Sequence, residues 1–293
     1  MLLQYGTMVV VGALSRSEGC GVYRSEFKES VFEMCNDGAR VDIGVLGSLA
    51  VTVGGMAANI QSRRMQTIVA LLALESGTVV SYEQLAAELW PAKVPSNPRN
   101  ALQANVTRIR RLISPLPDLI RTTRGGYVMD VPRECLDSNR FLTLLSTASK
   151  YVKIEPAQAI LLLERALGLW RGDALSGVRE SPRCSSEAAY LEERRIAAWN
   201  DLESARLVVG DEWQAVAELR KLVRTYPRQE RLVELFMLAL YRVGRQSEAL
   251  DVYHRARRLL VENQGVQPGP ALERMYAGIL EHNPPDDWFC SAA

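Results

Sequence analysis

The chain has 293 residues, of which 47% are hydrophobic and 24% are charged, a balance typical of a globular protein with about two domains. Thirty-five Lys and Arg residues face 34 Asp and Glu residues, so the net charge of +1 disfavours a uniformly basic nucleic-acid-binding protein and an acidic tail protein. No apolar run approaches the roughly 20 residues of a membrane span, and five scattered cysteines without a C-x-x-C pair favour free thiols in a reducing cytoplasm.

Residue types that carry catalysis or bind metals are scarce in this chain. It holds two histidines, His254 and His282, which supply a histidine-based metal site or a Ser-His-Asp triad poorly. It contains no G-x-x-x-x-G-K-[ST] loop that would cradle nucleotide phosphates. The sequence therefore predicts no catalytic residues, no metal site and no cofactor.

The N-terminal region consists of two parts that differ in hydrophobic pattern. Residues 1–40 show no clear hydrophobic period and are predicted to form a disordered leader. Short apolar runs over 41–47 and 49–53 have the length and the β-branched content of strands. The pair Gly54-Gly55 then marks a turn.

Three helices are predicted next, over 62–74, 81–90 and 97–113. The second begins with a capping box, in which Ser81 is the N-cap and Gln84 lies three residues later. The third begins with the N-cap Asn97, followed by Pro98 at the first helical position, where proline is well tolerated. Both starts are therefore well defined by the sequence.

A basic hairpin follows the third helix. Strands predicted over 119–122 and 127–131 flank the glycine-rich turn 123–126, and the hairpin carries Arg121, Thr122 and Arg124. A helix-turn-helix followed by such a hairpin is the arrangement of a winged helix. Residues 41–134 are therefore predicted to form a winged-helix DNA-binding domain.

From about residue 135 the chain is predicted to be helical, over 138–151, 156–170, 187–209, 212–225, 228–243, 246–263 and 269–282. Two units repeat at the tetratricopeptide period of 34 residues, because Gly210 recurs as Gly244 and Ala215 as Ala249. Small residues at such positions let two helices approach closely. A generic helical array is the alternative.

The predicted fold class is mostly α with small β elements, an N-terminal winged helix-turn-helix followed by an all-α tetratricopeptide-like helical repeat domain. The second domain is placed over 135–283, with a tail over 284–293. Trp170, Trp199 and Trp213 are predicted to fill gaps between its helices.

The third predicted helix has two contrasting faces. At 100° per residue, one apolar stripe contains Leu102, Val106, Ile109 and Ile113. The opposite face carries no carboxylate and contains Asn100, Gln103, Thr107, Arg108 and Arg111, with Arg110 on the flank. Arg binds guanine edges in bidentate fashion, and Asn and Gln bind adenine edges. The face therefore favours reading of DNA bases, and the alternative is an ordinary basic, solvated face.

Neighbouring residues support a DNA contact. Arg63 and Arg64 begin the first helix, whose free N–H groups and positive dipole end suit a phosphate. Ten basic and six acidic residues between 60 and 134 give this segment a charge of +4, as phosphate neutralisation requires. Tyr127 is interpreted either as a phosphate contact or as a packing residue.

Five blocks of the sequence resemble one family in the same order: 99–112, 124–127, 169–175, 238–250 and 260–272. Residues 41–134 resemble an OmpR/PhoB-type winged helix, and 135–283 resemble the bacterial transcriptional activation domain. Together they resemble the Streptomyces antibiotic regulatory proteins. The leader and the stretch Val261-Glu-Asn-Gln-Gly265 depart from the family pattern.

The resemblance implies a transcriptional activator of a secondary-metabolite gene cluster, located in the cytoplasm at the nucleoid and not at a membrane. It implies two or more protomers on promoter direct repeats of double-stranded DNA, and recruitment of the RNA polymerase holoenzyme. The candidate DNA-binding residues are Arg63, Arg64, Arg99, Asn100, Gln103, Thr107, Arg108, Arg110, Arg111, Arg121, Thr122, Arg124 and Tyr127. The loop 91–96 suggests Trp90 and Lys93 as polymerase contacts, although Trp90 is also interpreted as a core anchor.

Two other functions remain open from the sequence. The helical domain could serve as a protein-binding scaffold with secondary DNA contact, and a winged helix positions a repressor as well as an activator. An enzyme has little support, because no nucleophile–base pairing is evident.

Overall fold

The computed structural model describes residues 41–114 and 116–285. The predicted leader 1–40 therefore lies outside the described residues, as does the predicted tail apart from residues 284 and 285. No helix within the described ranges is both long enough and apolar enough to cross a membrane.

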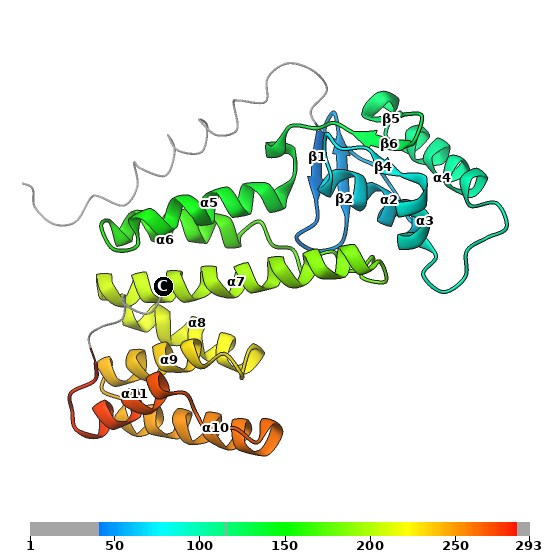
Figure 1. Ribbon diagram of the computed structural model, residues 1–293. Coiled ribbons are helices and arrows are strands. Elements are labelled where there is room, and N and C mark those ends of the chain that lie inside the picture. The colour runs from blue at the N-terminus through cyan, green and yellow to red at the C-terminus, as the bar shows by residue number, and fades with distance from the viewer. Residues whose placement is uncertain (1–40, 115, 286–293) are drawn as a thin grey trace, which may run out of the picture. The chain divides into compact units, whose positions relative to one another are not determined.

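A small antiparallel sheet opens the described chain (Figure 1). It has the order β1 (Val41–Gly44), β2 (Ala50–Val53) and β3 (Met56–Ala57), with Val41 opposite Val53. Gly54 and Gly55 make the predicted turn, with φ values of 58° and 82° that favour glycine. The strand β3 was not predicted, because two residues carry no readable alternation.

The winged helix is built from α2 (Arg63–Leu74), α3 (Tyr82–Leu89), α4 (Pro98–Leu112) and a second sheet. The sheet has the order β4 (Val80–Ser81), β6 (Gly126–Met129) and β5 (Ile120–Thr122). Both predicted helix starts are confirmed. The Ser81 hydroxyl accepts the Gln84 N–H at 3.1 Å, the Gln84 side chain accepts the Ser81 N–H at 2.8 Å, and Asn97 Oδ1 accepts the Asn100 N–H at 3.1 Å.

The strand β4 is the element that completes the wing sheet, and the sequence did not predict it. Val80 pairs with Tyr127 and Ser81 pairs with Gly126, so the hairpin gains a third strand from the segment before α3. Because β4 has only two residues, its formation depends on this tertiary pairing and not on local pattern.

The helical domain consists of α5 (Asp137–Tyr151), α6 (Pro156–Leu167), α7 (Pro182–Val209), α8 (Glu212–Thr225), α9 (Glu230–Arg242), α10 (Gln246–Gln264) and α11 (Pro270–Leu280). The predicted bounds of α6 and α7 were wrong. The first ends at Leu167 and not at residue 170, and the second begins at Pro182 and not at residue 187. Ser181 caps α7 by accepting the Cys184 N–H at 3.2 Å, a start masked in sequence by a first turn of mostly polar residues.

The predicted repeat is confirmed by matching geometry in its two units. Gly210 and Gly244 both end a helix region in the left-handed conformation, with φ values of 82° and 77°. Ala215 and Ala249 are both fully buried. The prediction for Trp213 was wrong, since this side chain is 68% exposed on the first turn of α8.

The buried apolar side chains form two cores. The boundary between these cores does not coincide with the boundary between the winged helix and the helical domain. One core runs from Ile43 to Leu202 and includes the winged helix together with α5, α6 and most of α7. The other runs from Leu207 to Ile279. The winged helix therefore shares a continuous core with the helices that follow it.

Asp137 anchors this shared core. Its buried carboxylate accepts the N–H of Val45 at 2.7 Å and of Leu46 at 3.2 Å, and Arg171 donates to it at 3.1 Å. Burial raises the pKa of Asp137, while these hydrogen bonds oppose the rise. The end of β1 is thus fixed to the first turn of α5.

Candidate nucleic-acid interface

The helix α4 is the candidate recognition helix, and its predicted apolar stripe is confirmed. Leu102, Val106, Ile109 and Ile113 are all at most 1% exposed. The opposite face is exposed and presents Asn100, Gln103, Thr107, Arg108 and Arg111. The stripe packs α4 onto α2 and α3, and this packing turns the polar face outward.

The exposed face of α4 presents donors and acceptors in the absence of negative charge. The helix has no acidic residue in its first turn, and Arg110 and Arg111 lie in its last turn. The Thr107 hydroxyl donates to the Gln103 carbonyl at 2.9 Å, which leaves its oxygen lone pairs toward solvent. Arginine and amide side chains on such a face match the edges of guanine and adenine.

Two arginines of this helix contact other side chains or backbone groups of the protein. Arg110 is half-buried and donates to the Ile120 carbonyl and to the Thr122 hydroxyl of the wing. The Arg99 guanidinium lies 4.4 Å from the centre of the Tyr82 ring, a cation–π contact. The structure therefore separates Arg110 from the exposed residues with which the sequence grouped it.

The wing presents its tip to solvent. Thr123 closes the turn, because its backbone N–H donates to the Gly126 carbonyl at 2.9 Å and its hydroxyl accepts the Gly126 N–H at 3.1 Å. Arg124 and Gly125 lie between them and are exposed. A cation at the tip of a rigid turn is well placed for a phosphate or a minor groove.

Other predicted wing residues are held by protein partners. Tyr127 is only 2% exposed and packs edge-on against Tyr82, with ring centres 5.4 Å apart. Its burial also raises the pKa of its hydroxyl. Arg121 is exposed and pairs with Asp130 at 3.3 Å. The structure thus places Tyr127 in the core, which favours the packing interpretation.

Tyr82 is a residue whose importance the sequence did not reveal. It contacts both Arg99 and Tyr127, and its hydroxyl donates to the Thr123 carbonyl at 3.4 Å. It therefore joins the start of the recognition helix to the wing. The available signal was an aromatic residue directly after the N-cap Ser81, which is not specific.

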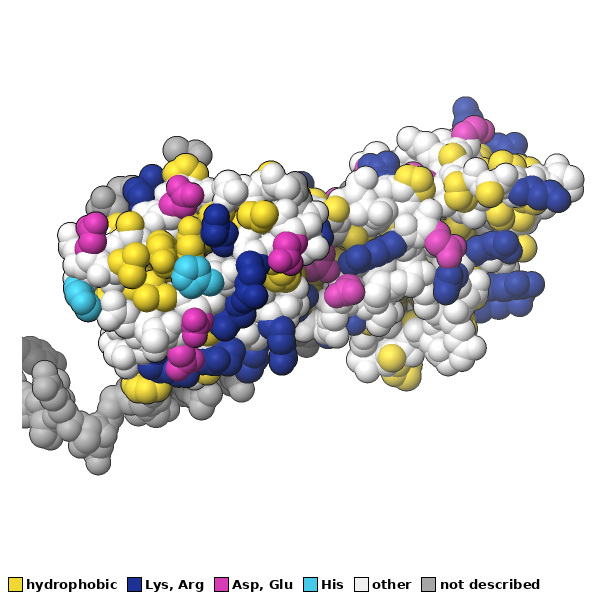
Figure 2. Space-filling view, turned by 90° about the horizontal axis from the view of Figure 1, so that it is seen from below, with side chains coloured by type: hydrophobic (Ala, Val, Ile, Leu, Met, Phe, Trp, Pro, Cys, Tyr) yellow, Lys and Arg dark blue, Asp and Glu magenta, His cyan; other side chains and the backbone are white. Residues whose placement is uncertain are grey.

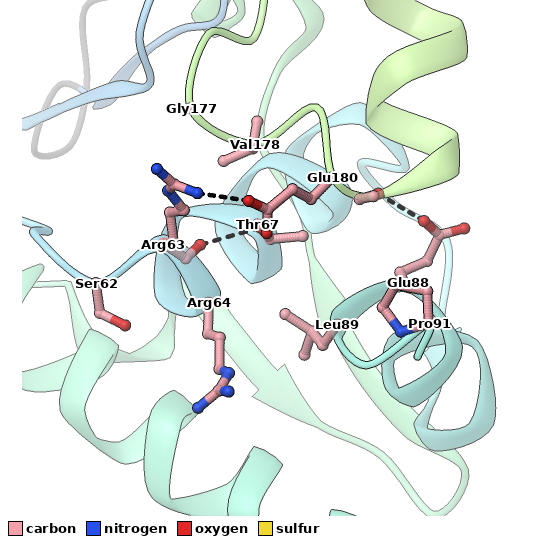
Figure 3. A pocket seen from close by; sticks show the side chains of 11 residues that line it. Ser62, Arg63, Arg64, Thr67, Glu88, Leu89, Pro91, Gly177, Val178 and Glu180 are labelled. Carbon is pink, nitrogen blue, oxygen red and sulfur yellow. Dashed lines mark hydrogen bonds and ion pairs between the residues drawn. The ribbon is translucent and has the colours of Figure 1, made fainter. Parts of the chain in front are cut away.

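The start of α2 faces the helical domain as well as solvent. Arg63 forms an ion pair with Glu180, and Figure 3 shows both side chains on the wall of a cavity that the loop before α7 also lines. Arg64 points away from this pair in Figure 3, and its guanidinium lies 6.0 Å from the centre of the Trp90 ring. Trp90 is only 9% exposed, as expected for the core anchor.

Basic side chains are exposed on the winged helix and on the helical domain. Figure 2 shows Lys and Arg side chains in dark blue over both ends of the visible face, with fewer acidic ones among them. Lys93 is exposed in the loop between α3 and α4. The +4 charge of residues 60–134 therefore rests on their composition.

Comparison with known proteins finds family models that match two separate stretches of the chain. Residues 60–129 match the family model described as "Transcriptional regulatory protein, C terminal", and residues 136–280 match "Bacterial transcriptional activator domain". The transcriptional regulator RedD of Streptomyces coelicolor is 42% identical over 255 residues, covering 85% of this chain and 73% of that protein. The regulatory protein DnrI of Streptomyces peucetius is 33% identical over 254 residues, covering 83% of this chain and 93% of that protein.

A solved structure has a similar fold. Mycobacterium tuberculosis EmbR, in complex with a low affinity phosphopeptide, superimposes with a TM-score of 0.79 at 27% sequence identity. The match covers 85% of this chain and 67% of that chain.

Proposed function

Because the chain belongs to the Streptomyces antibiotic regulatory protein family, we propose that it is a pathway-specific transcriptional activator of a secondary-metabolite gene cluster. It binds double-stranded DNA through the winged helix and acts without catalysis. The observation that carries the proposal is the exposed, acid-free face of α4 beside the exposed wing tip.

The proposed base contacts extend along the recognition helix from its first turn to its last. Asn100, Gln103, Arg108 and Arg111 lie on one exposed face and have the donor groups that read a major groove. Arg124 at the wing tip supplies a phosphate or minor-groove contact. Arg121 and Arg64 are exposed at the margins and add electrostatic attraction.

The proposal extends to the assembly on the promoter. Two or more protomers bind direct repeats, and the protein recruits the RNA polymerase holoenzyme in the cytoplasm, at the nucleoid. Support comes from family membership and from the loop between α3 and α4, where Lys93 is exposed and accessible to a large partner. Since Trp90 is buried, Lys93 is the stronger of the two polymerase candidates.

A base contact by Arg108 is tested by its replacement with alanine. We expect Arg108→Ala to weaken binding to the target promoter by about 1–3 kcal/mol in a mobility-shift titration, as the loss of a bidentate base contact does. Arg224→Ala is the matched control, since Arg224 is an exposed helical arginine outside the winged helix. Equal affinity of Arg108→Ala and the wild type would contradict this assignment.

The proposed phosphate contact of Arg124 has a different signature. We expect Arg124→Ala to weaken binding to specific and unrelated DNA alike, and to reduce the slope of log K against log salt by about one. The measurement is a salt titration of the wild type and Arg124→Ala, each on the specific and on an unrelated DNA. A loss confined to the specific sequence would show that Arg124 reads bases instead.

A protein-binding scaffold is the second candidate function, and one observation favours it. Trp213 is 68% exposed, and Val208 and Val209 are 47% and 45% exposed nearby in the chain. Exposed large apolar groups are typical of protein interfaces. A footprint on the DNA flanking the gene, combined with in vitro transcription, separates the two. A scaffold gives no protected repeats, a repressor gives protection with lower transcription, and an activator gives protection with higher transcription.

A further inference from the structure

Arg110 bridges the recognition helix and the wing. It lies in the last turn of α4, on the flank between the buried stripe and the exposed face. Its Nε and Nη2 groups donate to the Ile120 carbonyl at 3.0 and 2.6 Å, and Nη2 also donates to the Thr122 hydroxyl at 2.9 Å. Ile120 and Thr122 are the first and last residues of β5.

The position of β5 in the sheet makes this bridge important. The described residues give β5 one strand neighbour, β6, so it is an edge strand. An edge strand of three residues is held by few backbone hydrogen bonds. Hydrogen bonds from a charged guanidinium are stronger than neutral ones, and here they hold both ends of β5.

We infer that Arg110 is a positioning residue, which fixes the wing against the recognition helix so that both meet DNA in one geometry. This inference rests on the proposed function. The guanidinium is a rigid planar fork, so it sets the distance and the angle between α4 and β5. The wing tip Arg124 follows β5 in the chain, and Arg108 precedes Arg110 by two residues on α4.

A positioning role and a direct phosphate contact of Arg110 predict different DNA affinities for the variant Arg110→Lys. A phosphate contact needs only the charge, so Arg110→Lys would keep most of the affinity and Arg110→Gln would lower the salt slope by about one. A positioning fork needs the planar geometry, so both variants lose affinity to a similar degree. For DNA affinity the control is Arg224→Lys, because Arg224 is an exposed helical arginine outside the winged helix. For experiments without DNA the matched control is Arg111→Lys, because Arg111 is the exposed neighbour on the same helix turn.

The first experiment measures amide hydrogen exchange of the wing, residues 119–129, in the full chain without DNA. We expect Arg110→Lys and Arg110→Gln to speed exchange there at least about threefold, with Thr122→Val causing a smaller increase and Arg111→Lys none. Unchanged wing exchange in both Arg110 variants would overturn the inference. Because no DNA is present, this result is independent of whether the protein binds DNA.

The second experiment is a double-mutant cycle on DNA. If Arg110 positions the wing, the loss caused by Arg124→Ala in the wild type shrinks in the Arg110→Lys background, for example from about tenfold to less than about threefold. The control cycle combines Arg124→Ala with Arg111→Lys, for which the fold-changes multiply. Multiplying fold-changes in the Arg110 cycle would overturn the inference, whereas absence of DNA binding by the wild type would contradict the proposed function instead.

Discussion

Gly126 occupies a position where the backbone of the wing meets β4 without space for a side chain. A Cβ at this residue would overlap the Val80 carbonyl oxygen and would lie 2.9 Å from the Ser81 Cα. The neighbouring Gly125 has nothing within 4 Å of a Cβ. The pair Gly125-Gly126 therefore contains one glycine required by close packing and one that packing does not require.

Alanine substitutions distinguish these two glycines. We expect Gly126→Ala to lower the free energy of unfolding by about 1–3 kcal/mol or more, because rigid backbone atoms of β4 must move. Gly125→Ala should change it by less than about 0.5 kcal/mol. Urea unfolding of both variants measures the difference, and equal stability of the two would contradict the steric argument.

Glu203 is a fully buried carboxylate in the helical domain. Burial raises its pKa to about 8, against the opposing effect of Arg206, while Glu218 and Asp211 raise it further. Glu203 Oε1 accepts from Arg206 at 2.8 Å, whereas Oε2 is buried without a hydrogen-bond partner in the described structure. The protonated form of this side chain is therefore favoured in the folded state.

The raised pKa of Glu203 gives stability a defined dependence on pH. The folded state keeps the proton on Glu203 from the ordinary pKa of 4.5 up to about 8. The contribution of this proton to the free energy of unfolding is therefore complete below pH 4.5 and is lost as the pH rises through 8. Between pH 6 and pH 9 we expect the wild type to lose more stability than Glu203→Gln, whose amide does not titrate. Urea unfolding at several pH values tests this, and parallel pH profiles would refute it.

At the scale of elements, Asp137 joins the end of β1, the first turn of α5 and the segment before α7. It is 3% exposed, and its carboxylate accepts from Val45, Leu46 and Arg171. Asp42 forms a comparable ion pair with Arg140 at 2.6 Å, but half of its side chain is exposed. Asp137 therefore makes a buried connection between elements, whereas Asp42 forms an ion pair at the surface.

Removal of each carboxylate should therefore have unequal effects. Asp137→Ala leaves two buried backbone N–H groups without an acceptor and should cost about 2–4 kcal/mol. Asp42→Ala breaks an exposed pair and should cost at most about 1 kcal/mol. Chemical denaturation near neutral pH provides the comparison, and similar costs for both would show that the connection through Asp137 is not structural.

Helix periodicity and capping residues predicted most elements, because these signals are local. The stripe of α4 and the caps Ser81 and Asn97 depend on neighbours within one or two turns. The strand β4 and the partners of Arg110 depend on residues far along the chain, or on a side-chain direction that a helical wheel does not give. A residue on the flank of a wheel can face solvent or a neighbouring strand, and only the tertiary packing decides.

At the scale of the molecule, the average charge concealed a basic segment that contains the proposed DNA-binding residues. The net charge of +1 is the sum of +4 over residues 60–134 and −3 over the remaining residues. The first apolar core, in contrast, does not stop where the basic segment ends. It continues from the winged helix into the helices that follow. The proposed DNA-binding surface thus lies in one segment, while the stability of that segment depends on packing against the next one.

This shared core predicts the behaviour of fragments. In a fragment over 41–134, Val45 and Leu46 lose the Asp137 carboxylate, and Ile43 loses its pairing with Leu136. A fragment over 41–209 retains these contacts and the whole first core, from Ile43 to Leu202. We expect the shorter fragment to unfold at least about 10 °C below the longer one, since each lost kcal/mol lowers the midpoint by several degrees in a domain of this size.

Both fragments contain all the proposed DNA-contacting residues, so any difference in DNA binding between them reports on folding. We expect the longer fragment to footprint the same promoter positions as the full chain, and the shorter one to bind more weakly at 37 °C and to recover affinity on cooling. Thermal unfolding followed by circular dichroism, with mobility shifts at two temperatures, measures both effects. Equal midpoints would mean that the winged helix is stable alone, and α5 to α7 would then serve only to connect it to the second core.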